Sequence, residues 1–382
     1  MNLKSPSRDR LAGLDTLRAL AIVVVMIFHL QGRLPDGFKP IGRFGWMGVD
    51  LFFVLSGYLI GSQLLKPVRD GRGVSLLGFY RKRAYRILPL YLVVLALYVF
   101  WPAWREETGL SPVWEFLTFT ENFFVDYWNN QAFSHVWSLC VEEHFYLLLP
   151  MIVLLLAKRP AVWKTVSVLA FFFALGLGMR SYEYFHVLLP MGRGAEHFST
   201  EYIERIYYPT YTRLDGLLAG VALALVRVLR PRWWERILRH ANWLLLGGVG
   251  LTVCVLWIFK DRFGPVGTLI GFPLMAIAMA LLVAAGADTR CWFGRMRLPG
   301  TKLVATLAFS LYLTHKEVAH LDELYLPGVM GGANWRSALL IAASCLVVAA
   351  AFYFVVERPF LVLRDRRGAE KADVEARVEP AL

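Results

Sequence analysis

Apolar runs in this sequence contain a few titratable side chains whose types and spacing could do chemistry. Arg18 and His29 lie in one such run, eleven residues apart. In a helix that separation is about 16 Å and close to three full turns, so both side chains lie on one face. A titratable group inside a membrane is costly unless it is paired or lines a wet cavity. Each is therefore a candidate for function, with a plain interhelical hydrogen bond as the alternative.

The other titratable groups sort by their expected depth. The outer half is expected to hold His29, Asp50, His135, Glu142, Glu143 and His315, and the inner half Arg18, Arg86 and the Glu357-Arg358-Pro359 segment; Arg213 and Asp215, near the outer end of their run, depart from this sorting. Arginines bind phosphates bidentately, and a desolvated histidine stays neutral near pH 7 and can act as a base. The layout suits an anionic ligand that enters from the cytoplasm and acid–base chemistry near the outer surface. Arg86 and Arg358 could instead simply extend their charges to the inner interface.

The elements that must position these residues are membrane helices. Of the 382 residues, 57% are hydrophobic and only 18% are charged, which is less charge than a soluble domain carries. A spanning helix needs about 20 mostly apolar residues. Ten windows qualify, namely Leu11–Leu30, Trp46–Leu65, Ile87–Trp104, Val136–Ala157, Val162–Met179, Thr212–Val228, Trp243–Phe259, Val266–Ala285, Leu303–His320 and Ser337–Val356. The sequence predicts an all-α, polytopic bundle of about ten transmembrane helices.

The distribution of charge predicts the orientation of this bundle. With the N-terminus inside, each cytoplasmic loop is rich in Lys and Arg, whereas the outside segment Arg105–Phe133 has five acidic residues against one Arg. The positive-inside rule therefore places both termini in the cytoplasm and accounts for the net charge of +12 without nucleic acid. We expect a membrane-embedded domain over residues 1–362 and a short, disordered cytoplasmic tail over residues 363–382. The outside segments Arg105–Phe133 and Arg180–Tyr211 are expected either to shape an acceptor site or to be plain connectors.

The cysteines indicate neither a metal site nor a disulfide framework. Cys140, Cys254, Cys291 and Cys345 are scattered without paired spacing. Most of them lie in apolar runs and are expected to be small core hydrophobes. A nucleophilic role for Cys140 stays open, although no sequence feature pairs this residue with a base.

Seven motifs, taken together, resemble the acyltransferase-3 family of integral membrane O-acyltransferases. In chain order they are Arg18 and His29, Gly48–Ile60, Phe79–Pro89, His135–Tyr146, Arg213–Leu217, Ser310–His315 and Glu357–Pro359. They span nearly the whole chain and are specific as a set. His144 stands where the family usually has Gln. Lys316 and Glu317 stand where many members are apolar, and we expect them to form a helical neighbour pair at the outer interface.

The resemblance implies a multi-pass protein of the bacterial inner membrane that moves an acyl group from acyl-CoA, usually acetyl-CoA, to an acceptor hydroxyl. The acceptor is often on a surface polysaccharide, glycolipid or small glycoside. Acyl-CoA is then a substrate, and no bound cofactor or metal is expected. The resemblance also implies that Arg18 and His29 matter most.

A mechanism can be assigned to these residues as a hypothesis. His29 takes the proton of the acceptor hydroxyl, Asp50 or Glu142 holds its imidazole tautomer, and a donor such as Ser138, Tyr312 or His315 stabilises the oxyanion. An acyl-His29 intermediate is the competing route.

The donor phosphates are expected to meet the basic loop with Arg81, Arg83 and Arg86, and Arg358, although topology explains that loop equally well. A proton-coupled secondary transporter is the main alternative, because buried His and carboxylates also build proton relays. No inverted repeat supports it. A non-catalytic scaffold or sensor is a further alternative.

Overall fold

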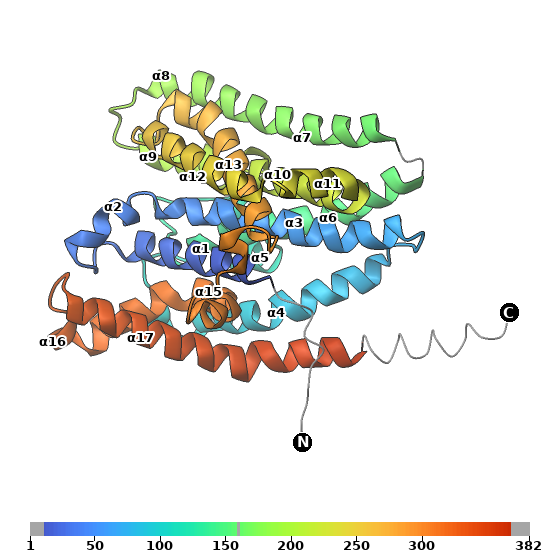
Figure 1. Ribbon diagram of the computed structural model, residues 1–382. Helices are drawn as coiled ribbons and strands as arrows, with labels where there is room; N and C mark the ends of the chain where they lie inside the picture. The colour runs from blue at the N-terminus through green and yellow to red at the C-terminus, as the bar shows by residue number, and fades with distance from the viewer. Residues whose placement is uncertain (1–10, 159–160, 368–382) are drawn as a thin grey trace. The chain divides into compact units, whose positions relative to one another are not determined.

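The computed structural model describes residues 11–158 and 161–367, and this part of the chain is built from helices (Figure 1). The main helices are α1 (Ala12–Leu30), α3 (Gly48–Arg69), α4 (Leu76–Phe100), α6 (Trp137–Lys158), α7 (Val162–Tyr182), α10 (Asp215–Leu229), α12 (Ala241–Ile258), α13 (Phe272–Gly286), α15 (Thr301–Tyr325) and α17 (Trp335–Phe352). Short helices connect them: α2 (Lys39–Gly42), α5 (Val113–Leu117), α8 (Leu189–Met191), α9 (Phe198–Tyr202), α11 (Pro231–Leu238), α14 (Trp292–Arg295) and α16 (Pro327–Met330). The all-α prediction is confirmed.

Each of the ten predicted windows coincides with a main helix. Within the described residues, eight helices are long and apolar enough to cross a membrane. The other two are α10, which has only 15 residues, and α15, which has 25 residues but a strongly polar second half. The sequence therefore predicts ten spans, two more than the eight helices that are long and apolar enough, and the two additional ones are α10 and α15.

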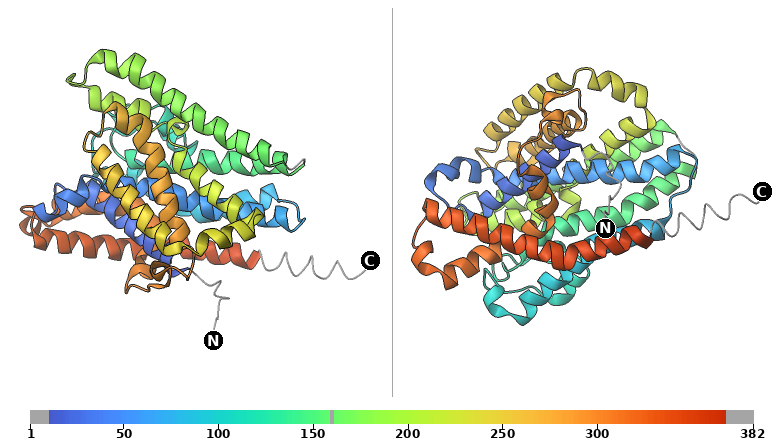
Figure 2. Two further views of the ribbon diagram at one scale, coloured as in Figure 1. Left: turned by 45° about the horizontal axis from the view of Figure 1, so that its top comes forward. Right: turned by 60° about the horizontal axis from the view of Figure 1, so that its bottom comes forward.

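The helix α7 runs further than the sequence windows indicate. It passes the expected end at Met179, continues as a π-helix over Glu183–Leu188 and ends in α8. This long helix forms an edge of its part of the molecule (green, Figure 2). Arg180, expected to open an outside segment, therefore lies inside a helix.

At the chain's other end, helix continues past residue 362 to Arg367, and the remainder of the predicted tail lies outside the described residues.

The chain divides into two compact units. The first comprises Met1–Gly32, Asp36–Val74 and Glu107–Ala308. In it α10 packs closely along α3, because a side chain at Gly57 would meet the carbonyl oxygen of Leu217 at 2.2 Å and one at Gly220 would meet that of Val54 at 2.3 Å. Close approach of backbones through small residues is typical of membrane helices. The α3–α10 pair is therefore a rigid support for the residues it carries.

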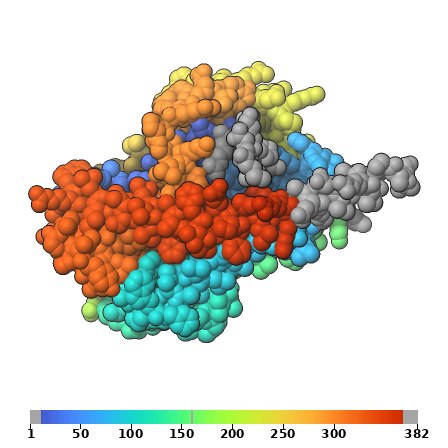
Figure 3. Space-filling model, turned by 90° about the horizontal axis from the view of Figure 1, so that it is seen from below, coloured from blue at the N-terminus to red at the C-terminus, as the bar shows by residue number. Residues whose placement is uncertain are grey.

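The second unit comprises Arg33–Pro35, Ser75–Glu106 and Phe309–Leu382. The helix α17 lies on its surface (red, Figure 3). Large apolar side chains are exposed along it and along the π-helical turn that follows it (Tyr353–Glu357), among them Leu339 at 69%, Val347 at 69% and Val355 at 75%. Such a continuous apolar face is expected where a helix contacts lipid.

Candidate active site

Two histidines of the first unit come together at the end of α1. The rings of His29 and His135 are 6.2 Å apart between centroids and inclined by 60°. His29 lies in the last turn of α1 and is half-buried, whereas His135 is only 2% exposed. The sequence placed both residues at one depth, and the structure adds that they are neighbours.

The backbone before His135 adopts a conformation that non-glycine residues rarely take. Phe133 has φ of 63° and begins the 3₁₀ turn Ser134–Val136, which leads directly into α6. The centroid of its buried ring lies 5.5 Å from that of the Phe116 ring and 5.4 Å from that of the His135 ring. A left-handed residue of this kind costs roughly 1–3 kcal/mol and persists only where the surroundings impose it. The turn thus fixes His135 beside α1.

Arg18 belongs to the same helix as His29 but to its opposite end. Its guanidinium forms an ion pair with Asp15, with 3.5 Å between Nη1 and Oδ1, and keeps 23% of its side chain exposed. Asp15 is buried. Sequence reasoning missed Asp15, although its spacing of three residues from Arg18 is the signal for a helical ion pair.

Glu142 takes part in a hydrogen-bonded chain between α3 and α6. The Tyr146 hydroxyl donates to Oε2 of Glu142 at 2.8 Å, and the same hydroxyl bonds to Ser56 of α3. Because Glu142 and Tyr146 are four residues apart, they share one face of α6. The carboxylate is therefore held in a fixed position on a partly buried face.

Asp50 belongs to a buried network of ion pairs instead of standing alone. Both its carboxylate oxygens accept hydrogen bonds from Nη2 of Arg213, at 2.9 and 3.0 Å. Arg213 is 2% exposed, and its guanidinium lies 4.1 Å from the Phe272 ring centroid and 4.7 Å from that of Tyr207. Asp50 thus neutralises a buried arginine; the predicted role of Asp50 or Glu142 in orienting His29 stays a prediction.

A second ion pair lies in the same unit. Arg180 is fully buried, donates to Asp215 through both Nη1 and Nη2, and also bonds the Thr212 carbonyl at 2.7 Å. Sequence reasoning missed Arg180 as a functional or structural residue. Asp215 at the start of α10 was the available signal, since a buried arginine needs a carboxylate.

His144 stands where the family resemblance leads us to expect Gln. Its Nδ1 bonds the Thr210 hydroxyl at 2.7 Å, and its ring stacks on Phe123 at 4.9 Å. The same Thr210 oxygen accepts from the side chain of Asn122 at 2.9 Å. His144 therefore fastens α6 to the segment before α10.

The neighbouring Glu121 is almost completely buried. Burial, together with the negative charge of Glu115, raises the pKa of Glu121 well above its ordinary value of 4.5.

His315 of α15, in the second unit, has a defined tautomer. It is fully buried, and its Nδ1 lies 2.9 Å from the Leu311 carbonyl and 3.0 Å from that of Tyr312. Carbonyl oxygens only accept, so Nδ1 carries the proton and Nε2 is the acceptor in the neutral ring. His315 can therefore accept a proton or a hydrogen bond through Nε2.

Lys316 and Glu317, which follow His315, both contact residues that are far away in the sequence. Glu317 is fully buried and bonded to the Tyr98 hydroxyl, and Lys316 donates to Glu106 at 2.7 Å. Each side chain therefore has a partner on another segment of the second unit, and the neighbour pair at the outer interface stays a prediction. Sequence spacing along one helix cannot show such partners.

The candidate donor-binding residues also lie in the second unit. Arg86 forms an ion pair with the buried Glu357 at 3.4 Å, and Ser310 donates to the same carboxylate at 3.1 Å. Arg358 is exposed, with its guanidinium 5.6 Å from the Phe354 ring centroid. Arg81 is exposed and Arg83 is half-buried. Arg86 is thus anchored by Glu357, whereas Arg81 and Arg358 are open to solvent.

The chain is similar in sequence to known O-acetyltransferases. The chain is 26% identical over 374 residues to the peptidoglycan O-acetyltransferase OatA of Listeria monocytogenes, covering 91% of this chain and 56% of that protein. It is 27% identical over 336 residues to the O-acetyltransferase OatA of Staphylococcus aureus (83% and 52%), and 26% identical over 377 residues to the putative peptidoglycan O-acetyltransferase YrhL of Bacillus subtilis (93% and 56%). The chain therefore spans about half the length of these relatives.

No solved structure is significantly similar to the chain. The sequence model of the acyltransferase domain matches residues 11–355, a range that contains His29, His135 and every other candidate residue except those of the Glu357–Pro359 segment. Because this match covers nearly all of the chain, the chain belongs to the acyltransferase-3 family.

Proposed function

We propose that this protein transfers an acetyl group from cytoplasmic acyl-CoA to a hydroxyl of a carbohydrate at the outer side of a bacterial inner membrane. The observation that carries the proposal is the histidine pair His29–His135 in a multi-pass chain of the acyltransferase-3 family. Titratable side chains inside a membrane protein are rare, and they commonly mark functional sites. Proton transfer from a hydroxyl is the chemistry that a neutral imidazole performs near pH 7.

The two histidines have different roles in this proposal. His29 is half-buried and so remains open to a substrate, whereas His135 is almost fully enclosed. His29 is therefore the catalytic base, and His135 is a positioning residue beside it. The left-handed Phe133 holds the His135 ring in place.

The reaction balances with these groups alone. The acceptor hydroxyl oxygen bonds to the thioester carbonyl carbon while its proton passes to the His29 imidazole. The tetrahedral intermediate then collapses, the carbon–sulfur bond breaks, and the CoA thiolate leaves. The imidazolium returns the proton to that thiolate, so that the products are the acetyl ester and free CoA.

Acyl-CoA as the donor is supported by family membership and by the distribution of basic residues. Arg81, Arg83, Arg86 and Arg358 are the candidates for its phosphates. Of these, Arg81 and Arg358 are exposed and free of a carboxylate among the described residues. Guanidinium groups bind phosphate oxygens in a bidentate fashion.

The acceptor class is supported by the names of the relatives, two of which are described as peptidoglycan O-acetyltransferases, one of them putatively. A glycan of the cell envelope presents many hydroxyls on the outer side of the membrane. The positive-inside pattern of the loops favours the outer side for the His29 end of α1. We therefore propose a cell-envelope glycan as the acceptor.

The test is acetyl transfer by the purified full-length protein in lipid nanodiscs with radiolabelled acetyl-CoA and a peptidoglycan-derived oligosaccharide. We expect His29→Ala to abolish transfer and Arg18→Ala to reduce it strongly. His240→Ala and Arg232→Ala are matched controls, because both side chains are exposed, and we expect them to retain wild-type rates. Thermal melting confirms that each variant is folded. Transfer retained by His29→Ala would remove the base from this mechanism, and a wild type that neither binds nor consumes acetyl-CoA would overturn the donor.

A further inference from the structure

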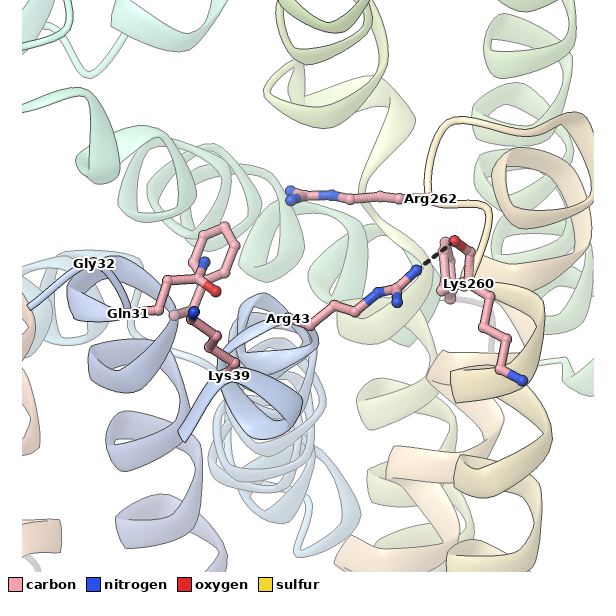
Figure 4. Close-up of a pocket in the computed structure, with 8 residues that line it drawn as sticks. Gln31, Gly32, Lys39, Arg43, Lys260 and Arg262 are labelled. Atoms are coloured by element: carbon pink, nitrogen blue, oxygen red, sulfur yellow. Dashed lines mark hydrogen bonds between the residues drawn. The ribbon is translucent and has the colours of Figure 1, made fainter. Parts of the chain in front are cut away.

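A basic pocket lies in the first unit at the end of α1. It has a volume of about 540 Å³ and is lined by Phe28, Gln31, Lys39, Arg43, Lys260 and Arg262, among others. Figure 4 shows the side chain of Arg262 reaching across the space above Arg43 towards Gln31. The volume is within the range of small-molecule sites. Among the described residues, no acidic side chain lines the pocket.

Arg262 is oriented by aromatic rings and lacks an acceptor. Its guanidinium carbon lies 5.3 Å from the ring centroid of Phe28, 5.0 Å from that of Trp46 and 5.4 Å from that of Tyr207. In the described part of the chain it forms neither a hydrogen bond nor an ion pair through its side chain. A guanidinium has five N–H donors in a fixed fork. This group is therefore prepared for acceptor oxygens that the protein itself does not supply.

The neighbouring charges do not neutralise Arg262. Asp261 is the adjacent acid, and it is paired with Arg193. Arg43 donates one hydrogen bond to the Lys260 carbonyl, at 2.9 Å. That leaves the guanidinium of Arg43 without a carboxylate among the described residues. The pocket thus carries net positive charge from two arginines.

The two lysines contribute less to this charge. Lys39 is paired with Asp36 at 2.8 Å, although 81% of that aspartate side chain is exposed. The ammonium end of Lys260 points away from the space between the arginines (Figure 4). Arg43 and Arg262 are therefore the residues that decide what the pocket binds.

The pocket adjoins His29 through one residue. The Phe28 ring lines the pocket. Its centroid lies 5.3 Å from the guanidinium carbon of Arg262 and 5.2 Å from the centroid of the His29 ring. It lies at the end of α1 opposite Arg18, about 16 Å away along the helix. A ligand held here would present its other end to His29.

We propose that this pocket binds an anionic oxygen group, a phosphate or a carboxylate, of the acceptor glycan. The inference rests on the proposed function and narrows its acceptor to an anionic sugar. Paired arginines recognise such groups through bidentate, charge-assisted hydrogen bonds. Binding the anion beside Phe28 fixes the distance between the charged group of the sugar and the hydroxyl that reacts at His29.

The kinetic test uses probes that differ only in charge. Full-length protein in nanodiscs receives a disaccharide of N-acetylglucosamine and N-acetylmuramic acid, or its methyl ester, and in a parallel arm a sugar 1-phosphate or the free sugar. For Arg262→Gln we expect the KM of the charged probe to rise about 10- to 100-fold relative to its neutral partner. Whichever arm shows the rise identifies the group as carboxylate or phosphate. Arg297→Gln, which removes an exposed arginine of the same unit, should leave the ratio at its wild-type value. Equal KM changes for charged and neutral probes would overturn the proposal.

A binding test keeps this inference separate from the proposed function. Saturation-transfer NMR measures binding of the charged and neutral probes without any donor. Binding of the charged probe by wild type and its loss in Arg262→Gln supports the pocket even if no acetyl transfer occurs. Equal binding of charged and neutral probes, or no binding of either, overturns it. Loss of CoA binding in Arg262→Gln would assign the pocket to the donor and would likewise overturn it.

Discussion

The two units each bury a polar network, and they stabilise it in different ways. In the first unit two carboxylates face two guanidinium groups, as Asp50 with Arg213 and Asp215 with Arg180. In the second unit two carboxylates, Glu106 and Glu317, contact one hydroxyl, that of Tyr98, and the ammonium of Lys316 donates to Glu106.

The difference concerns protons. The Tyr98 hydroxyl contacts both Glu106, at 2.6 Å, and Glu317. A hydroxyl has a single hydrogen, so one of these two contacts requires a proton from a carboxyl group. Glu106 is paired with Lys316, and the fully buried Glu317 therefore carries that proton. One network is balanced by charge and the other by protonation, which is the less costly state for a fully buried acid.

The largest effect is expected where the charge balance is broken. Arg213→Ala leaves Asp50 buried without its cation and should lower the free energy of unfolding by about 3–5 kcal/mol. The measurement is unfolding in mixed micelles with increasing detergent denaturant, with the exposed Arg232→Ala as control. The double variant Asp50→Leu/Arg213→Met should recover much of the loss. A loss no greater than that of the control would show that the pair is not a stabilising charge balance.

Protonation is also expected to stabilise Glu121, a buried acid of the first unit that lies outside the membrane-spanning helices. Burial raises the pKa of Glu121 in the folded protein well above the ordinary 4.5. The folded state then binds this proton more tightly than the unfolded state, so its stabilising contribution is full below about pH 4.5 and is lost as the pH rises through the folded pKa.

The matched variant is Glu121→Gln, which stays neutral at every pH. We expect its melting temperature, relative to wild type, to increase steadily between pH 5 and 9. Glu107→Gln, at an exposed position, should follow wild type throughout. A constant difference between Glu121→Gln and wild type over this range would mean that Glu121 does not hold the proton.

The smallest effect on the free energy of unfolding is expected at Glu317, because its carboxyl group is already neutral. Glu317→Gln replaces a neutral carboxyl by a neutral amide that can still donate to Tyr98, and it should cost under about 1 kcal/mol. Glu317→Ala should cost more, because it leaves the buried Tyr98 contact unmade. These values come from the same micelle unfolding experiment. A cost for Glu317→Gln as large as that for Arg213→Ala would erase the distinction between the two networks.

Much of the fold follows from hydropathy, and part of the site follows from helix periodicity. All ten apolar windows coincide with main helices, and the shared face of Arg18 and His29 follows from their spacing on the unbroken α1. His29 and His135 are also expected at the same depth, in the outer half of the membrane. These features depend on local sequence, which is why sequence alone predicts them.

The remaining features depend on residues far apart in the chain. The sequence predicts Arg180 at the start of a polar loop, because its partner Asp215 is 35 positions away. Glu317 reads as a surface residue because Tyr98 is 219 positions away. The basic pocket combines the end of α1 with the turn around Arg262. Hydropathy cannot register such pairings, since it averages over neighbours in sequence.

The separation of Asp50 from Arg213 has a consequence for how the protein is made. The two residues are 163 positions apart, so at about 5–20 residues per second the ribosome adds Arg213 roughly 10–30 s after Asp50. Throughout that interval Asp50 of α3 lacks its partner Arg213, which has not yet been synthesised. Its carboxyl group must stay protonated or in contact with water until α10 arrives and the glycine contact at Gly57 and Gly220 closes. A nascent chain stalled before α10 therefore leaves the Asp50 carboxyl group without the arginine that neutralises it in the folded protein.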